Sequence, residues 1–286
     1  MASNQFRVAL LQLAVKDNKA ENMSKAATAI RKAAESGADV VCLPAGFACP
    51  NGSRGFLQTT ESIPGETSEM LSYTAKTNNI YLVGGTMIEK DSHGNMFKTC
   101  LVYGPDGTMI AKHRKLHLFD IDVPGKLTHR ESDVITAGDE LTVFETPFCR
   151  VGVGICYDVR FPQLAQVYAD LGCKLLVFPG AFNKTMGSLH WELLHRARAV
   201  DNQVYVAALS PARDEGAAYV AWGHSMLVDP QGKVVQSAGL DETVVMGEVD
   251  LDYLSSVRQQ SPVEKQRRDD LYKLVRCEGK TNTCAQ

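Results

Sequence analysis

The chain has 286 residues, enough for one large domain or two modest ones, and its 44% hydrophobic and 22% charged residues are ordinary for a globular enzyme. A net charge of −3 and a pI near 6.2 give no indication of nucleic acid or an anionic membrane as a partner. No apolar run is long enough to cross a bilayer, and residues 1–5 lack the features of a signal peptide. We therefore expect a cytoplasmic protein whose eight cysteines are thiols rather than a disulfide framework.

The first part of the chain alternates between strands and helices. Residues 6–14 predict a buried strand, and residues 22–36 place apolar side chains at helical spacing. Residues 38–43 predict a second strand, ended by Pro44. This order is typical of an α/β sheet, which places ligands at the carboxyl ends of its strands. The next expected elements are a helix at 67–78 and strands at 80–88, 98–103 and 108–112.

Residues 113–140 show little periodicity, and a segment of this length inside a compact domain is usually functional. It begins with a basic run in which His113 and His117 lie four residues apart. Arg114 and Lys115 between them argue against a zinc site, and the chain has neither a Cys-x-x-Cys nor a His-Glu-x-x-His motif.

The strand–helix order returns after residue 150. The expected elements are helices at 163–171 and 189–202, strands at 174–178 and 203–209, a hairpin of strands 220–228 and 233–237, and a strand at 244–249. Residues 265–270 form a polar cluster, either exposed or at the rim of an oligomer contact. No linker or shift in composition divides the chain. We expect one domain over residues 1–276 and a flexible tail at 277–286.

Cys156 lies between a run typical of a buried strand, residues 151–155, and the helix start indicated by Pro162. The unpaired N–H groups at the start of a helix favour a thiolate, so this cysteine is a candidate nucleophile. A lone cysteine is more often a small buried hydrophobic residue, which is what we expect of Cys42, Cys100 and Cys173.

A cysteine that attacks a carbonyl carbon needs a base, donors for the oxyanion and a proton for the leaving group. Lys115 is a candidate cation for the oxyanion, and the backbone N–H of Tyr157 is a candidate second donor. A single lysine would otherwise be interpreted as a solvated surface residue.

Together with six motifs, these residues give the chain a resemblance to the nitrilase superfamily of carbon–nitrogen hydrolases over nearly its whole length. The motifs are residues 114–126 (RKLHLFDIDVPGK), 154–161 (GICYDVRF), 179–183 (PGAFN), 190–194 (HWELL), 210–214 (SPARD) and 219–225 (YVAWGHS). Within the superfamily the chain is most similar to the omega-amidase branch, also called nitrilase homologue 2.

The resemblance implies a four-layer α-β-β-α sandwich and a homodimer. It also implies hydrolysis of the terminal amide of 2-oxoglutaramate and 2-oxosuccinamate through a cysteine thioester, with no metal or organic cofactor. The family uses a Glu-Lys-Cys triad, in which Lys115 and Cys156 match two members. Glu131 matches a further family glutamate that steadies the lysine.

The third member of the triad is absent. Where the family reads Leu-Pro-Glu after the second strand, this chain has Ala45 after Leu43 and Pro44. The nearby residues that still fit the pattern are Phe47, Pro50, Gly52 and Ser53. A methyl group cannot accept a proton, and loss of a general base costs on the order of 10²–10⁴-fold in rate. Either the glutamate was replaced deliberately, or this homologue has lost or re-routed its base.

The resemblance also suggests a substrate pocket formed by Tyr157, Arg160, Phe119 and Phe182. Arg160 would suit a carboxylate of the oxo acid, or it could form a structural ion pair. Two alternative functions stay open: a non-catalytic binding or regulatory protein on the same fold, and an amidase for deaminated glutathione. Residues 210–214 argue against the second.

Overall fold

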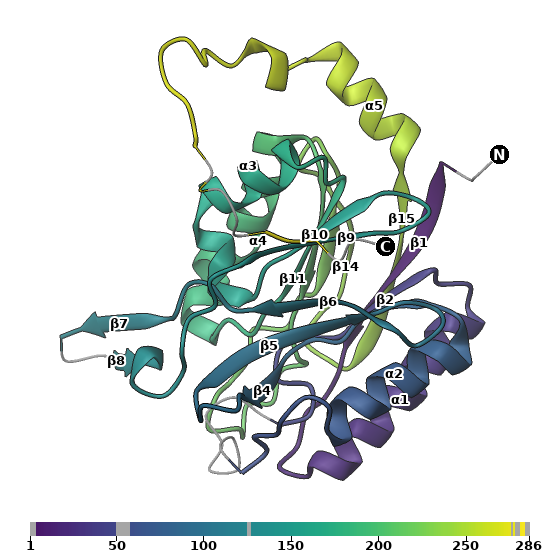
Figure 1. The fold of residues 1–286 in the computed structure, drawn as a ribbon, viewed down its shortest axis with the longest axis vertical. Helices are drawn as coiled ribbons and strands as arrows, with labels where there is room; N and C mark the ends of the chain where they lie inside the picture. Colours follow the sequence, from purple (N-terminus) through teal and green to yellow (C-terminus); the bar gives the residue numbers. More distant parts are fainter. Residues whose placement is uncertain (1–3, 50–57, 125–126, 276, 278–280, 284–286) are drawn as a thin grey trace.

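The computed structural model describes residues 4–49, 58–124, 127–275, 277 and 281–283. Two seven-stranded sheets face each other, and helices cover the outer side of each sheet (Figure 1). Several motif positions named above lie outside the described residues: Pro50, Gly52, Ser53, Gly125 and Lys126, with most of the expected tail.

The first sheet has the strand order β15-β1-β2-β3-β5-β4, with β6 paired to β5. Its strands are β1 (Gln5–Gln12), β2 (Val40–Cys42), β3 (Tyr81–Val83), β4 (Met87–Lys90), β5 (Met96–Tyr103), β6 (Met109–Arg114) and β15 (Thr243–Asp250). Helices α1 (Lys19–Glu35) and α2 (Glu66–Asn78) cover its outer face. Side chains alternate along β1, so that Val8 and Leu10 point to the other sheet while Ala9 and Leu11 pack with the helices.

The second sheet has the order β14-β13-β12-β11-β10-β9-β16. Its strands are β9 (Leu141–Glu145), β10 (Arg150–Val153), β11 (Leu175–Pro179), β12 (Tyr205–Leu209), β13 (Met226–Val228), β14 (Val234–Ser237) and β16 (Thr281–Thr283). Helices α3 (Pro162–Asp170) and α4 (Lys184–Asn202) cover its outer face. The same alternation recurs on β11, where Leu175 and Val177 face inward and Leu176 and Phe178 face the helices.

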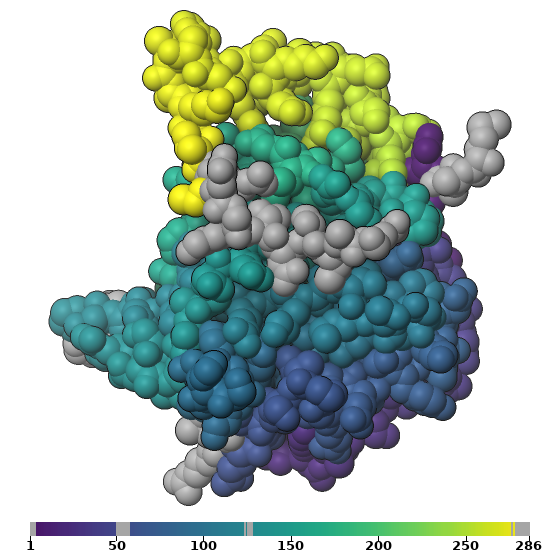
Figure 2. Space-filling view, in the orientation of Figure 1, coloured from purple at the N-terminus to yellow at the C-terminus, as the bar shows by residue number. Residues whose placement is uncertain are grey.

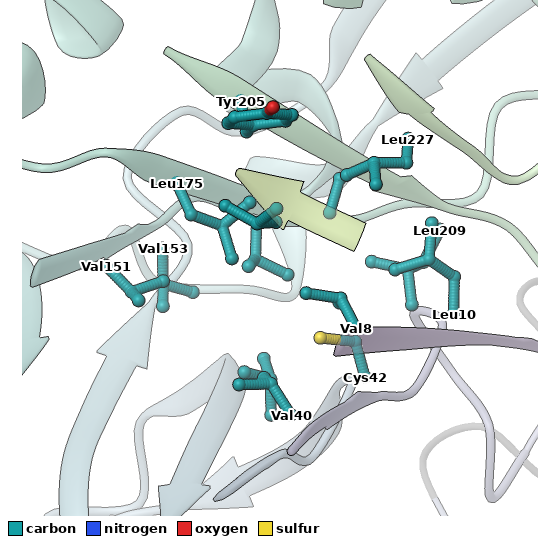
Figure 3. Close-up of a cluster of buried hydrophobic side chains, with 14 of the residues drawn as sticks. Val8, Leu10, Val40, Cys42, Val151, Val153, Leu175, Tyr205, Leu209 and Leu227 are labelled. Atoms are coloured by element: carbon teal, nitrogen blue, oxygen red, sulfur yellow. The ribbon is translucent and has the colours of Figure 1, made fainter. Parts of the chain in front are cut away.

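The main core fills the space between the sheets (Figure 3). Val8, Val40 and Cys42 from the first sheet meet Val153 and Leu175 from the second. Burial of one aliphatic side chain contributes roughly 1.5–3 kcal/mol, so this layer holds the two sheets together. The expected α-β-β-α sandwich is confirmed.

Several elements differ from the sequence prediction. The segment 113–140 is not an irregular loop, because β7 (Asp120–Val123) and β8 (Leu127–Arg130) pair in an antiparallel ribbon that projects from the side of the molecule (Figure 2). The predicted strand 80–88 is two strands, β3 and β4, which are separated at Gly85 by its positive φ of 62°. Helix α5 (Leu251–Gln260) was not predicted; the Asp250 side chain caps it by accepting a hydrogen bond from Tyr253 N.

Helix α4 begins earlier than the predicted residue 189. The side chain of Asn183 accepts a hydrogen bond from Met186 N at 2.8 Å and caps the helix, so that its first residue is Lys184. Within the expected tail, Thr281–Thr283 form β16, which pairs in parallel with β9. None of the helices within the described ranges combines the length and apolar character needed to cross a bilayer.

Candidate active site

A cavity of about 740 Å³ lies where the parallel strands β2, β10 and β11 end. Ala45 follows β2, Cys156 follows β10, and Phe182 follows β11. The predicted site residues Ala45, Lys115, Phe119, Glu131, Cys156, Tyr157, Arg160 and Phe182 all line this cavity. The structure therefore brings every predicted site residue to one place.

Cys156 is half-buried and opens a short 3-10 helix, Cys156–Arg160, between β10 and α3. It lies between a strand and a helix as predicted, but α3 begins only at Pro162. Its φ of 50° is in the left-handed region, which is unusual for a residue other than glycine. Such a conformation at a cavity wall is typical of a functional turn.

Asp158 holds this turn against the basic segment. Its carboxylate accepts hydrogen bonds from Ile155 N at 2.8 Å, from His117 N at 2.9 Å and from His117 Nδ1 at 2.8 Å, and it contacts His113 Nε2 at 3.3 Å. Burial would raise the pKa of Asp158, but these hydrogen bonds outweigh burial and lower it. The two histidines considered as zinc ligands are therefore partners of a buried carboxylate. In the part of the chain described, no group of three or more His, Cys, Asp or Glu side chains is arranged to hold a metal ion.

Lys115 and Glu131 form a buried ion pair in the cavity wall. Lys115 Nζ donates to Glu131 Oε2 at 2.5 Å, and the same oxygen accepts from Phe119 N at 2.6 Å. The Lys115 residue is only 2% exposed. Glu131 therefore lies within hydrogen-bond distance of the lysine.

A second lysine, Lys98, was missed by the sequence analysis. Its Nζ lies 2.5 Å from Glu131 Oε1, so that Glu131 is held between two ammonium groups. Burial alone would raise the pKa of Glu131, but Lys98 and Lys115 outweigh it and lower the pKa to about 2. The alternation of side chains along β5 indicates that Lys98 points inward, because it shares one face of the strand with the buried residues Cys100 and Val102.

Ala45 is 6% exposed and forms an isolated parallel bridge with Thr86. The Thr86 hydroxyl accepts a hydrogen bond from Gly46 N at 2.9 Å, which fixes the turn after β2. The side chain at this position ends in a methyl group and offers no proton acceptor to the cavity.

Aromatic rings and one arginine form the rest of the predicted pocket. The Tyr157 ring meets the Phe119 ring edge-on at 5.1 Å, and Phe182 packs edge-on against Trp191 at 5.3 Å. Arg160 Nη2 lies 2.9 Å from His190 Nδ1. Within the described ranges Arg160 forms no ion pair with a carboxylate, so the interpretation as a structural ion pair has no support there.

Tyr219 is a further wall residue that was not predicted as a site residue, although it lies in the motif 219–225. Its hydroxyl donates to Ala181 O at 2.5 Å. Burial raises the pKa of Tyr219, and negative charge at Cys156 or Glu131 raises it further, so the ring remains a neutral phenol.

Comparison with known proteins identifies the family. Residues 7–259 match the carbon–nitrogen hydrolase family model. The chain is 56% identical over 268 residues to omega-amidase NIT2-B of Xenopus laevis, covering 94% of this chain and 97% of that protein. It is 55% identical to omega-amidase NIT2 of Homo sapiens, covering 93% and 96%.

Solved structures agree with the sequence comparisons. Nit3 of Saccharomyces cerevisiae, a member of branch 10 of the nitrilase superfamily, is 39% identical with a TM-score of 0.85, covering 93% of this chain and 97% of that one. The NitFhit protein of C. elegans is 35% identical with a TM-score of 0.87, covering 96% and 67%. The chain described here is therefore a member of the carbon–nitrogen hydrolase family, within the nitrilase superfamily.

Proposed function

We propose that this protein is an omega-amidase that hydrolyses the terminal amide of 2-oxoglutaramate and 2-oxosuccinamate to ammonia and a 2-oxo dicarboxylate. Two relatives named omega-amidase are 55–56% identical over more than nine-tenths of the chain. The observation that carries the proposal is that Cys156 and the Lys115–Glu131 pair line one cavity in a chain so similar to those enzymes.

The reaction proceeds through a thioester in this proposal. Cys156 Sγ bonds to the amide carbon, the C–N bond breaks, and the leaving nitrogen takes the proton given up by the thiol and departs as ammonia. Water then attacks the thioester, which releases the acid and returns a proton to the sulfur. Lys115 Nζ and the Tyr157 backbone N–H stabilise the oxyanion in both half-reactions. Glu131 orients the lysine.

Substrate recognition is assigned to Arg160 and to three aromatic rings that line the cavity. The Arg160 guanidinium suits the 2-oxo acid carboxylate, because its planar donors match two carboxylate oxygens. The rings of Phe119, Tyr157 and Phe182 enclose the short carbon chain. A neutral amide carries no group that would pair with Arg160, so the proposal favours amides of dicarboxylic acids.

Ala45 is expected to impair this activity, and restoring the carboxylate tests the assignment. Ala45→Glu should raise the rate of ammonia release from 2-oxoglutaramate, by up to about 10²–10⁴-fold if no other group in the cavity already acts as the general base. The control is Ala45→Glu combined with Cys156→Ala, which should release no ammonia.

The same assay separates the alternatives. If neither the original chain nor Ala45→Glu releases ammonia, a non-catalytic binding or regulatory role replaces the proposal. Faster hydrolysis of deaminated glutathione than of 2-oxoglutaramate would instead assign the chain to the neighbouring branch.

We also propose that residues 1–276 act as one domain in a cytoplasmic homodimer. The exposed side chains of Leu189, Leu193 and Val200 follow one another on α4 at helical spacing, and an apolar stripe of this kind is typical of an interface. A monomer in analytical ultracentrifugation would contradict the dimer.

A further inference from the structure

Lys98 and Lys115 are opposite each other on neighbouring strands. Thr99 of β5 is paired with Arg114 of β6, and the next pair continues this register, since Lys115 N donates to Lys98 O at 2.8 Å. Opposed residues of an antiparallel pair share one face of the sheet. Both side chains therefore reach the same carboxylate, each at 2.5 Å and each at a different oxygen of Glu131.

This cluster holds one more cation than anion when both lysines are protonated. The side chains of Lys98, Lys115 and Glu131 are 19%, 2% and 4% exposed, so water screens the surplus charge poorly. Two opposed like charges destabilise a sheet, and one carboxylate balances only one of them. Release of one proton from the cluster removes the imbalance.

Lys98 is a group that can release this proton. Burial lowers the pKa of Lys98 and the Lys115 ammonium lowers it further, against the opposing effect of Glu131. Glu131, with its pKa lowered to about 2, is too weak a base to take a proton from a thiol. A lysine kept partly neutral by burial and a neighbouring cation is a known kind of catalytic base.

The cavity brings Lys98 together with Cys156 and Ala45. All three line it, and Lys98 and a Cys156 thiolate are close enough to interact electrostatically. Besides the Lys115–Glu131 pair, the other titratable side chains on the walls are His129, Arg130, Tyr157, Arg160, Lys184 and Tyr219. We propose that neutral Lys98 is the general base of this enzyme and replaces the carboxylate that is absent at Ala45.

The proton balance of this step rests on the proposed amidase function. The Lys98 Nζ lone pair takes the proton of the Cys156 thiol, directly or through one water, as the sulfur bonds to the amide carbon. The resulting ammonium returns that proton to the leaving nitrogen, which departs as ammonia. In deacylation Lys98 takes a proton from the attacking water and returns it to the sulfur.

The test compares substitutions at Lys98 in two backgrounds, the original chain and Ala45→Glu. In the original chain, Lys98→Gln should lower kcat for 2-oxoglutaramate by at least about tenfold with little change in KM. In the Ala45→Glu background, the same substitution should change kcat less than about threefold, because the introduced carboxylate takes the proton. An equal loss in both backgrounds, a loss confined to KM, or no loss would each overturn the proposal.

Lys98→Arg is the decisive variant, since a guanidinium keeps the positive charge but cannot act as a base. It should be as slow as Lys98→Gln, and it should also slow alkylation of Cys156 by iodoacetamide across neutral and alkaline pH. An active Lys98→Arg would show that only the charge matters and would overturn the proposal. Lys112→Arg, on the opposite face of the same strand pair, is the matched control and should leave both rates unchanged.

The same set of variants separates the two proposals. If Ala45→Glu combined with Lys98→Gln hydrolyses 2-oxoglutaramate while Lys98→Gln alone has the activity of the original chain, the amidase function holds and the role of Lys98 does not. If no variant hydrolyses it, the amidase function itself is wrong.

Discussion

The two faces of the β5–β6 strand pair carry the same charges in different surroundings. On the cavity face, Lys98 and Lys115 share Glu131. On the opposite face, Lys112 and Arg114 share Glu89, which also accepts from the Thr99 hydroxyl at 2.6 Å. Each cluster contains two cations and one carboxylate.

The difference lies in the type of cation and in its access to water. Arg114 holds Glu89 with two hydrogen bonds, at 2.9 and 2.6 Å, and its guanidinium stacks on the Phe97 ring at 3.7 Å. The side chains of Arg114 and Lys112 are 26% and 36% exposed, so water screens their surplus charge. An arginine cannot release a proton, whereas a buried lysine can. The comparison describes the opposite face as a structural clamp, and it is the cavity face to which we assign the reactive role.

Removing the carboxylate from the cavity face should have the largest effect on stability. Glu131→Gln removes the carboxylate that both buried lysines contact, and breaking a buried ion pair in this way costs roughly 3–5 kcal/mol. Urea denaturation would measure the loss. A loss below about 1 kcal/mol would mean that water reaches the cluster freely and that the two faces do not differ.

Lowering the pH should remove the part of the unfolding free energy that depends on ionised Glu131. The folded protein lowers the pKa of Glu131 from 4.5 to about 2, so its contribution is complete above 4.5 and is lost as the pH falls toward 2. This contribution is about 3 kcal/mol. The stability difference between the original chain and Glu131→Gln should shrink by that amount over this range, as followed by urea denaturation at each pH. A constant difference would contradict the lowered pKa.

Removing the carboxylate from the opposite face should have the smallest effect. Glu89→Gln leaves cations that water can hydrate, so we expect a loss of about 1–2 kcal/mol in urea denaturation. Amidase activity, measured as ammonia release from 2-oxoglutaramate in the Ala45→Glu background, should stay within about twofold. A larger loss of activity would remove the functional distinction between the two faces.

Much of the fold could be predicted from local patterns. Short apolar runs indicated β1 and β11, and helical spacing of apolar residues indicated α1. Helix α5 was not predicted because it follows β15 directly and because only two of its apolar residues, Leu254 and Val257, are buried. No local pattern predicts that β15 pairs with β1, because the paired residues Gln5 and Asp250 are far apart in the sequence.

The candidate site was predicted from its motifs, and its electrostatics were not. Cys156, Lys115 and Glu131 lie in recognisable runs, and the structure brings them to one cavity. Lys98 belongs to none of the motifs, and a single lysine near the start of a strand would ordinarily be interpreted as a solvent-exposed residue at the strand end. Only the cross-strand register, which the sequence does not contain, places it opposite Lys115.

The Asp158 carboxylate has a consequence for motion. It anchors Ile155, which precedes the cysteine, and His117, which lies two residues beyond the cavity lysine. The two segments cannot shift relative to each other without breaking these hydrogen bonds to a buried carboxylate. The contacts therefore oppose independent movement of the turn that carries the sulfur and the segment that carries the ammonium group.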